Sequence, residues 1–339
     1  MRTIEFLMQR QSLPIEAKII MAQRRIREWV ECFDIDNSYV SFSGGKDSTV
    51  LLHIARQIYP NIKAIFCNTG LEYPELVRFA KAQENVQIIR PKMNFKDVII
   101  KYGYPFISKE VAETVSQAKK NHITGKYCYR IEKLNGTAKD KNGNLSQYNM
   151  PKYKPLLDVK FNISQQCCDV MKKKPFRPYK NAILGLTAEE SNLRKQLWVK
   201  SGCNAFDNKK PTSNPLMVWT EQDILGYIKQ YSLKIASIYG EVSDSECGKL
   251  KCTGVQRTGC IFCGFGCHLD TRKGGVSRFI LLKSSHPKLY DYCMRGGEFV
   301  NGLWQPSNDG LGMAYPIDEL NRLYGKTWKS GKIKKFIEY

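Results

Sequence analysis

The residues of this chain with the clearest chemical potential form a short loop, SGGKDS, at positions 43–48. An apolar stretch precedes the loop, and a helical pattern follows it. Gly44 and Gly45 lack a β-carbon, so backbone N–H groups can approach an anion, and the start of the following helix adds a partial positive charge. Hydroxyl groups and a lysine complete the set that we expect to bind nucleotide phosphates: Ser41, Ser43, Gly44, Gly45, Lys46, Asp47 and Ser48.

The spacing of this loop differs from the GxxxxGK[ST] pattern of a Walker P-loop. The carboxylate of Asp47 does not suit a bare anion site, so we expect it to cap the helix or to help hold a Mg²⁺ ion that accompanies the nucleotide. SGGKDS resembles the PP-loop of the ATP pyrophosphatase, or adenine nucleotide α-hydrolase-like, group. That resemblance implies that the loop binds ATP, and that the reaction adenylates an oxygen atom and releases pyrophosphate.

Strand and helix patterns alternate around the loop. We expect an N-terminal helix over 14–33, strands over 38–42, 61–69 and 85–91, helices over 48–59 and 73–83, a strand and a helix within 182–199 with the helix capped near Thr187, and a helix over 220–232. This order predicts an α/β fold with a doubly wound parallel sheet, whose ligands lie at the carboxyl ends of the strands.

The same patterns predict three consecutive segments. They are an N-terminal helical segment over 1–36, a nucleotide-binding domain over 37–267 and a basic C-terminal extension over 268–339. Within the second segment, residues 116–154 are rich in Lys, Asn, Gly and Tyr and include an Asn-Gly turn. We interpret them as a basic insertion, which is either a solvated surface loop or a flap that contacts phosphates.

Several further motifs occur in one order along the chain. They are NTGLEYPE from Asn68, the tandem Cys167 and Cys168 before KKKP, GLTAEESNLR, NPLMVWTEQDILGYI and GCIFC. Together they resemble the phosphoadenosine phosphosulfate (PAPS) reductase family, a branch of the PP-loop fold, over about 37–267. The resemblance implies that a turn formed by Asn68, Thr69, Gly70 and Glu72 lies beside the nucleotide.

The same resemblance implies further site residues. Lys172–Lys174 and Arg194 would bind phosphate or sulfate groups, and we expect Lys46, Asp47, Lys174 and Arg194 to act in catalysis. Arginine offers a planar fork to phosphate oxygens, and lysines supply point charges. Asn68 stands where the family commonly has Asp, so a carboxylate role at that position is not expected.

The cysteines predict a metal centre. Cys260 and Cys263 form a C-x-x-C, a spacing that lets two thiolates reach one metal. Resemblance to the reductases adds Cys167 and Cys168 as ligands of a [4Fe-4S] cluster, whereas residues 252–263 resemble a compact cysteine stretch of DNA phosphorothioation enzymes. The alternates are Cys247, Cys252 and Cys267. A zinc ion held by four thiolates and free buried thiols remain open as alternatives.

The composition of the chain indicates what kind of molecule the protein binds and in which compartment it works. The 339 residues include 53 Lys and Arg against 32 Asp and Glu, a formal net charge of +21. This excess favours a polyanion such as DNA or tRNA. No apolar run reaches the length of a membrane span and no signal-peptide core begins the sequence, so we expect a cytoplasmic protein. Twelve cysteines in such a protein favour metal or redox chemistry over disulfides.

Three functions follow from these features. The first is an ATP-dependent, iron–sulfur enzyme that inserts sulfur into a nucleic acid, with a sulfur-donor protein such as a cysteine desulfurase. The second is a reductase that acts on adenylyl sulfate or its 3′-phosphorylated form and produces sulfite. Such reductases usually carry a degenerate phosphate loop and a C-terminal ECGxH, whereas here the loop is intact and the ECG at 246–248 precedes the C-x-x-C. The third is a nucleotide-responsive binding module with a structural metal.

Overall fold

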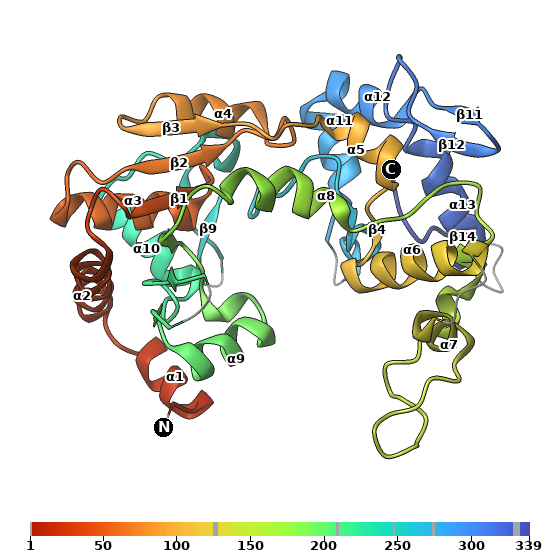
Figure 1. Cartoon of the computed structure of the whole chain (residues 1–339). Helices are drawn as coiled ribbons and strands as arrows, with labels where there is room; N and C mark the ends of the chain where they lie inside the picture. The colour runs from red at the N-terminus through yellow and green to blue at the C-terminus, as the bar shows by residue number, and fades with distance from the viewer. Residues whose placement is uncertain (1, 125–127, 208–209, 247, 273–274, 328–332) are drawn as a thin grey trace. The chain divides into compact units, whose positions relative to one another are not determined.

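The computed structural model describes residues 2–124, 128–207, 210–246, 248–272, 275–327 and 333–339 (Figure 1). Contacts divide the chain into two compact units, each built from two separate stretches of sequence. The first unit combines Met1–Pro91 with Lys174–Gly259, and the second combines Lys92–Lys173 with Cys260–Tyr339. These units are defined by contacts, so the segment boundaries expected at 36 and 267 stay a prediction.

The first unit contains a six-stranded sheet in the order β3-β2-β1-β5-β7-β6. Its strands are β1 (Tyr39–Phe42), β2 (Ala64–Cys67), β3 (Val86–Ile89), β5 (Ala182–Leu184), β6 (Asn204–Ala205) and β7 (Thr212–Ser213). All neighbouring strands are parallel except β6 and β7. The sheet confirms the predicted α/β class, and it places β1 and the loop that follows it between β2 and β5.

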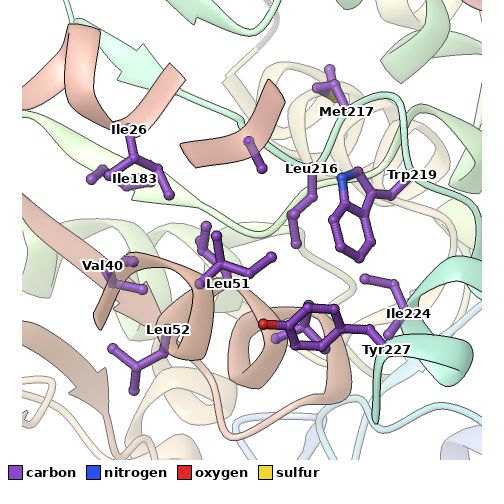
Figure 2. Packing of buried hydrophobic residues seen from close by; sticks show 14 of the residues in the cluster. Ile26, Val40, Leu51, Leu52, Ile183, Leu216, Met217, Trp219, Ile224 and Tyr227 are labelled. Carbon is purple, nitrogen blue, oxygen red and sulfur yellow. The ribbon is translucent and has the colours of Figure 1, made fainter. Parts of the chain in front are cut away.

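Helices of the first unit bury apolar side chains against this sheet. They are α1 (Ile4–Gln11), α2 (Ile15–Phe33), α3 (Lys46–Ile58), α4 (Pro74–Lys81), α9 (Asn192–Ser201) and α10 (Glu221–Gln230), with short turns η3 (Lys174–Phe176), η4 (Ala188–Glu190) and η5 (Ser237–Tyr239) and a hairpin of β8 (Val242–Asp244) and β9 (Leu250–Cys252). Figure 2 shows Val40 of β1, Leu51 of α3 and Ile224 of α10 in one core, all fully buried.

The predicted start of one helix was wrong. Thr187 precedes only the short 3₁₀ turn η4, and α9 begins at Asn192. Ser191 is the reason, because its backbone is extended (φ −165°) and its side chain accepts a hydrogen bond from the N–H of Arg194 at 3.3 Å. Serine at such a position is a favoured N-cap, so the helix begins after it.

The second unit contains α5 (Phe95–Tyr102), β4 (Phe106–Ile107), α6 (Lys109–Thr124), α7 (Tyr129–Asn135), η1 (Pro151–Leu157), α8 (Gln166–Cys168), η2 (Asp169–Lys173), β10 (Gly264–Phe265), η6 (Cys267–Leu269), α11 (Arg278–Ser285), α12 (Pro287–Met294), β11 (Glu298–Val300), β12 (Leu303–Gln305), α13 (Ala314–Tyr324), β13 (Lys326–Thr327) and β14 (Ile333–Lys334). β10 pairs in parallel with β4. A β-carbon on Gly264 would lie 2.4 Å from the Phe106 ring, so only glycine permits this approach.

The basic insertion near 116–154 is more regular than its composition suggests. It includes the end of α6, all of α7 and a tight turn in which the N–H of Asp140 donates to the carbonyl of Asn144 at 2.8 Å. This turn surrounds the expected Asn-Gly pair. None of the described helices is both long enough and apolar enough to cross a membrane.

Candidate nucleotide site and cysteine group

The loop after β1 is shaped by its own hydroxyl groups. The N–H of Ser43 donates to the Ser48 hydroxyl at 3.2 Å, and that hydroxyl donates to the carbonyl of Gly45 at 2.9 Å. Gly44 has a φ of +72°, a conformation that glycine adopts without strain. No side chain of the described residues caps α3 at Gly45. The N–H groups of the first turn of α3 are therefore available for an anion.

These residues line a cavity of about 440 Å³ in the first unit. Its lining is Ser41, Ser43, Gly45, Lys46, Asp47, Ser48, Leu184, Gly185, Leu186, Thr187, Glu189, Glu190, Arg194, Glu221, Tyr239, Gln256, Arg257 and Thr258. Most of the residues expected to bind phosphate and the expected Arg194 thus share one cavity. It lies beyond the carboxyl ends of β1 and β5, where ligands bind in parallel sheets.

Carboxylates hold the cations of this cavity in place. Lys46 Nζ lies 3.2 Å from Glu221 Oε1, and it lies over the Tyr239 ring at 5.6 Å from the centroid. Arg194 forms an ion pair with Glu190, and Arg257 lies 3.7 Å from the same carboxylate. A phosphate group that enters the cavity would compete with these carboxylates for the same cations.

Burial shifts the pKa values of two charged groups in the cavity. It raises the pKa of the Asp47 carboxyl, and the positive charges of Lys46 and Arg257 oppose that rise. Burial also lowers the pKa of the Arg194 guanidinium, to which Arg257 contributes further. Both effects mark a cavity whose walls solvate charge poorly, where an added anion would interact strongly with Lys46 and the arginines.

Sequence reasoning missed several residues of this cavity. Glu221 and Arg257 both lie within motifs that were noted, but nothing in either motif says that these side chains face Lys46 or Asp47. Gly185 carries a clearer signal, since it follows β5 directly. A β-carbon there would lie 3.1 Å from the backbone of Asp47, so glycine lets the β5 loop approach the start of α3.

Other expected site residues lie elsewhere among the described residues. The turn after β2 is closed by its own bonds, because Glu72 accepts hydrogen bonds from the N–H and hydroxyl of Thr69 at 2.9 and 2.8 Å, and Asn68 accepts one from the N–H of Gly70 at 3.1 Å. No residue of this turn is part of the described cavity lining, and neither is Lys174, which begins η3.

The second unit contains the expected cysteine group. Cys167 and Cys168 lie on α8 with their sulfur atoms 4.0 Å apart. A hydrogen bond with Cys168, burial, and the charges of Cys168, Cys263 and Cys260 raise the pKa of the Cys167 thiol. The hydrogen bond from Cys167 lowers the pKa of Cys168 to about 6, with Lys109 and Lys172 contributing. These four cysteines therefore influence one another electrostatically.

Arg278 holds the loop of Cys263. Its guanidinium forms two 2.7 Å bonds to Asp270 and donates to the carbonyls of Cys263 at 3.3 Å and Phe265 at 3.1 Å. Cys267 is buried in the same unit and its thiol donates to the carbonyl of Gly264 at 3.0 Å.

The remaining alternates are separate from this group. Cys252 ends β9 in the first unit, where burial raises its pKa and Lys46 opposes the rise. Cys247 lies outside the described residues.

The donor chemistry of the cysteine group suits an iron–sulfur cluster or zinc, because thiolates are the ligands of both. The oxygen donors of the nucleotide cavity likewise suit Mg²⁺. Among the described residues, however, no three His, Cys, Asp or Glu side chains are placed to hold a metal ion. The metal ligands therefore stay a prediction.

Comparison with known proteins identifies the family. The family model of the phosphoadenosine phosphosulfate reductase domain matches residues 37–138 and 109–273, more than half of the chain. The chain belongs to this family. The match runs through the nucleotide loop, the tandem cysteines and the C-x-x-C, in the order in which the sequence presents them.

Individual relatives of this PAPS reductase family protein are distant. A phosphoadenosine 5′-phosphosulfate reductase of Gloeobacter violaceus is 25% identical over 67% of this chain and 76% of its own length. An adenosine 5′-phosphosulfate reductase of Rhodococcus opacus is 23% identical, and a sulfate adenylyltransferase subunit 2 of a Shewanella species is 26% identical. The chain spans 64% and 61% of those two relatives. These matches confirm the predicted family and enzyme class.

Among solved structures, a PAPS reductase from Candida auris in complex with phosphate aligns with a TM-score of 0.36 and 14% identity, over 70% of this chain and 91% of that one.

Proposed function

We propose that this protein is an ATP-dependent, pyrophosphate-releasing enzyme that prepares a nucleic acid for sulfur insertion. The observation that carries the proposal is the intact phosphate loop, where the uncapped start of α3, Lys46 and Arg194 face one cavity of about 440 Å³. A nucleoside triphosphate would replace the carboxylates that pair with Lys46 and Arg194, and the net charge of +21 favours a nucleic acid as the second substrate.

In the proposed reaction the protein residues bind, orient and stabilise charge. The N–H groups of the loop and Lys46 would bind the β and γ phosphates, and Arg194 would neutralise charge at the α phosphate. An oxygen of the nucleic acid attacks the α phosphorus, the bond to the bridging oxygen breaks, and pyrophosphate leaves. A hydrosulfide equivalent then displaces AMP from the adenylated position. Such an equivalent is supplied by a sulfur-donor protein of the cysteine desulfurase kind together with a thiol reductant.

The cysteine group adds a cofactor to the proposal. Cys167, Cys168, Cys260 and Cys263 would hold a [4Fe-4S] cluster, and Arg278 would fix the backbone on which Cys263 lies. Zinc is the alternative metal. Iron and acid-labile sulfide analysis of protein purified without air distinguishes the two, since zinc brings neither.

Cys263→Ser tests the ligand set directly. We expect this variant to lose iron and the broad visible absorbance of the protein. Cys32→Ser is the matched control, because Cys32 is an exposed cysteine of α2. Equal iron content in both variants would exclude Cys263 as a ligand.

A sulfonucleotide reductase is the second candidate, since two of the relatives above are named as a phosphoadenosine 5′-phosphosulfate reductase and an adenosine 5′-phosphosulfate reductase. Incubation of the anaerobic protein with ATP and with adenylyl sulfate separates the candidates. Pyrophosphate release that depends on nucleic acid and disappears in Lys46→Ala supports the proposed activity. Sulfite release from adenylyl sulfate with a thiol reductant supports the reductase. The absence of both products would leave a nucleotide-responsive binding module.

A further inference from the structure

A second cavity of about 530 Å³ lies in the first unit and shares no described lining residue with the nucleotide cavity. Its walls come from α1, α2, the end of α9 and β6. Four basic side chains and one carboxylate line it, together with three aromatic rings. The basic residues are Arg2, Arg10, Arg25 and Lys200, the carboxylate is Asp207, and the rings are Phe6, Trp198 and Phe206.

The arginines of this cavity keep unused donors. Arg2 donates to the carbonyl of Lys200 at 3.3 Å, and among the described residues Arg10 donates only to the sulfur of Met21 at 3.8 Å, a weak acceptor. Within the described part of the chain, neither of them forms an ion pair, whereas Arg25 pairs with Glu28 at 2.6 Å. A guanidinium has several N–H donors, so donors remain for an anion that enters the cavity.

The charges of the three arginines all affect one residue of the cavity wall, Cys203. Burial raises the pKa of the Cys203 thiol, and the charges of Arg25, Arg10 and Arg2 all oppose this rise. Gly202 helps to place Arg2, because a β-carbon there would lie 3.0 Å from the Arg2 guanidinium. Positive charge from α1, from α2 and from Arg2, which precedes α1, therefore converges beside the turn between α9 and β6.

Aromatic rings stand beside this charge. Phe6 is 38% exposed, and its ring lies 6.1 Å from that of Trp198. The Arg10 guanidinium lies over the Phe6 ring at 4.6 Å from the centroid. A cationic group next to an exposed ring is the combination that binds a phosphate and stacks an attached base.

We propose that this cavity binds one nucleotide unit, with its phosphate at Arg2, Arg10 and Arg25 and its base against Phe6. The unit is either a free mononucleotide or one residue of a single-stranded nucleic acid, since both present a phosphate beside a planar base. The proposal goes beyond the ATP-dependent reaction and needs neither pyrophosphate release nor a metal.

Binding of a fluorescent single-stranded oligonucleotide, AMP and inorganic phosphate tests the proposal. The test variant is Arg10→Gln with Arg25→Gln. The control is Arg24→Gln, which removes one positive charge, against two in the test variant, from a neighbouring residue of α2 that also pairs with Glu28 but is 75% exposed and outside the cavity lining. We expect the double variant to weaken binding of the oligonucleotide or AMP about tenfold, and the control to change it less than about twofold.

Phe6→Leu gives an independent test that keeps all the charges. It should weaken AMP more than it weakens inorganic phosphate, because only AMP has a base to stack. Circular dichroism checks that each variant is folded. Tight binding of AMP identifies a mononucleotide site, and tight binding of the oligonucleotide alone identifies a strand site. Equal losses in the Arg24 control, or an affinity for inorganic phosphate equal to that for both AMP and the oligonucleotide, would overturn the proposal.

Discussion

Lys46 is neutralised in this structure by a carboxylate that sequence reasoning did not find. Only 6% of the Lys46 side chain is exposed, whereas 45% of Glu221 is. Glu221 can therefore turn toward solvent when a phosphate reaches Lys46, while Lys46 cannot leave the cavity. The pair keeps a buried cation compensated until the ligand arrives, which lowers the cost of holding Lys46 without nucleotide.

Glu221→Gln should therefore tighten ATP binding. The substitution removes a carboxylate that competes with phosphate for Lys46 and keeps a similar shape, so we expect the dissociation constant to fall about threefold to tenfold, in line with the modest energy of a partly exposed ion pair. Isothermal titration with ATP in the presence of a chelator measures the effect without metal. Glu31→Gln, an exposed residue of α2, is the control. Unchanged or weaker binding in Glu221→Gln would contradict this account.

At the scale of elements, α10 joins the nucleotide cavity to the N-terminal helices. Thr220 and Asp223 form a capping box at its start, and Asp223 also lies 2.7 Å from Nζ of Lys18 on α2, a lysine that is only 2% exposed. The helix that carries Glu221 is thus fixed at its first turn by a cap and by a buried ion pair.

The two interactions should differ in their contribution to stability. Thr220→Ala removes the cap and should lower the free energy of unfolding by about 1 kcal/mol. Asp223→Ala also leaves the buried charge of Lys18 without its carboxylate, and should cost about 3 kcal/mol or more. Urea denaturation of the two variants measures the difference. Similar losses in both would show that the ion pair with Lys18 contributes little.

The contact between α3 and α10 should make the free energy of unfolding depend on pH. Burial lowers the pKa of His53 on α3, whose Nδ1 lies 2.8 Å from the Tyr227 hydroxyl of α10. The unfolded chain, with an ordinary histidine pKa of about 6.5, then binds a proton more readily than the folded one. The burial of neutral His53 therefore contributes stability that is fully present above the unfolded pKa of about 6.5. It is lost as the pH falls through the lower pKa of the folded protein.

His53→Gln should therefore flatten the decline of stability between about pH 7 and pH 5.5. Glutamine can still form a hydrogen bond with Tyr227 but does not titrate in this range. Thermal unfolding of both proteins across the range, with pH 8 as the reference, gives the difference. Parallel curves would show that His53 has no part in the pH dependence.

Sequence patterns predicted local helices and strands better than they predicted which distant side chains meet in the fold. The helical spacing of its apolar residues predicts α2. The glycines before Lys46, which lack a β-carbon, predict the tight turn of the loop. The position of α9 could not be read in the same way, because Thr187 and Ser191 are both favoured cap residues and only Ser191 forms a side-chain cap in the structure. Glu221 reaches Lys46 across 175 positions of sequence, a separation at which no local pattern carries information.

At the scale of the whole molecule, the sequence order of the chain does not follow its compact units. Each unit is complete only after the chain has passed through a stretch of the other unit and returned. The nucleotide cavity draws on both stretches of the first unit, since Lys46 belongs to one and Arg194 to the other. Composition read along the chain does not show this, because each unit consists of two stretches that are separated in the sequence.

The net charge of +21 is a property of the whole chain, and it makes the last prediction. If the excess charge serves a nucleic-acid substrate, binding of a single-stranded oligonucleotide should release counterions, and the logarithm of the association constant should fall with the logarithm of salt concentration by about 0.7 for each phosphate neutralised. Anisotropy titrations at several salt concentrations give this slope. We expect it to correspond to several phosphates, because basic residues outnumber acidic ones by 53 to 32. ATP binding, measured over the same salt range, is the control for effects on a single small anion. A slope near zero for the oligonucleotide would mean that the positive charge serves no nucleic acid.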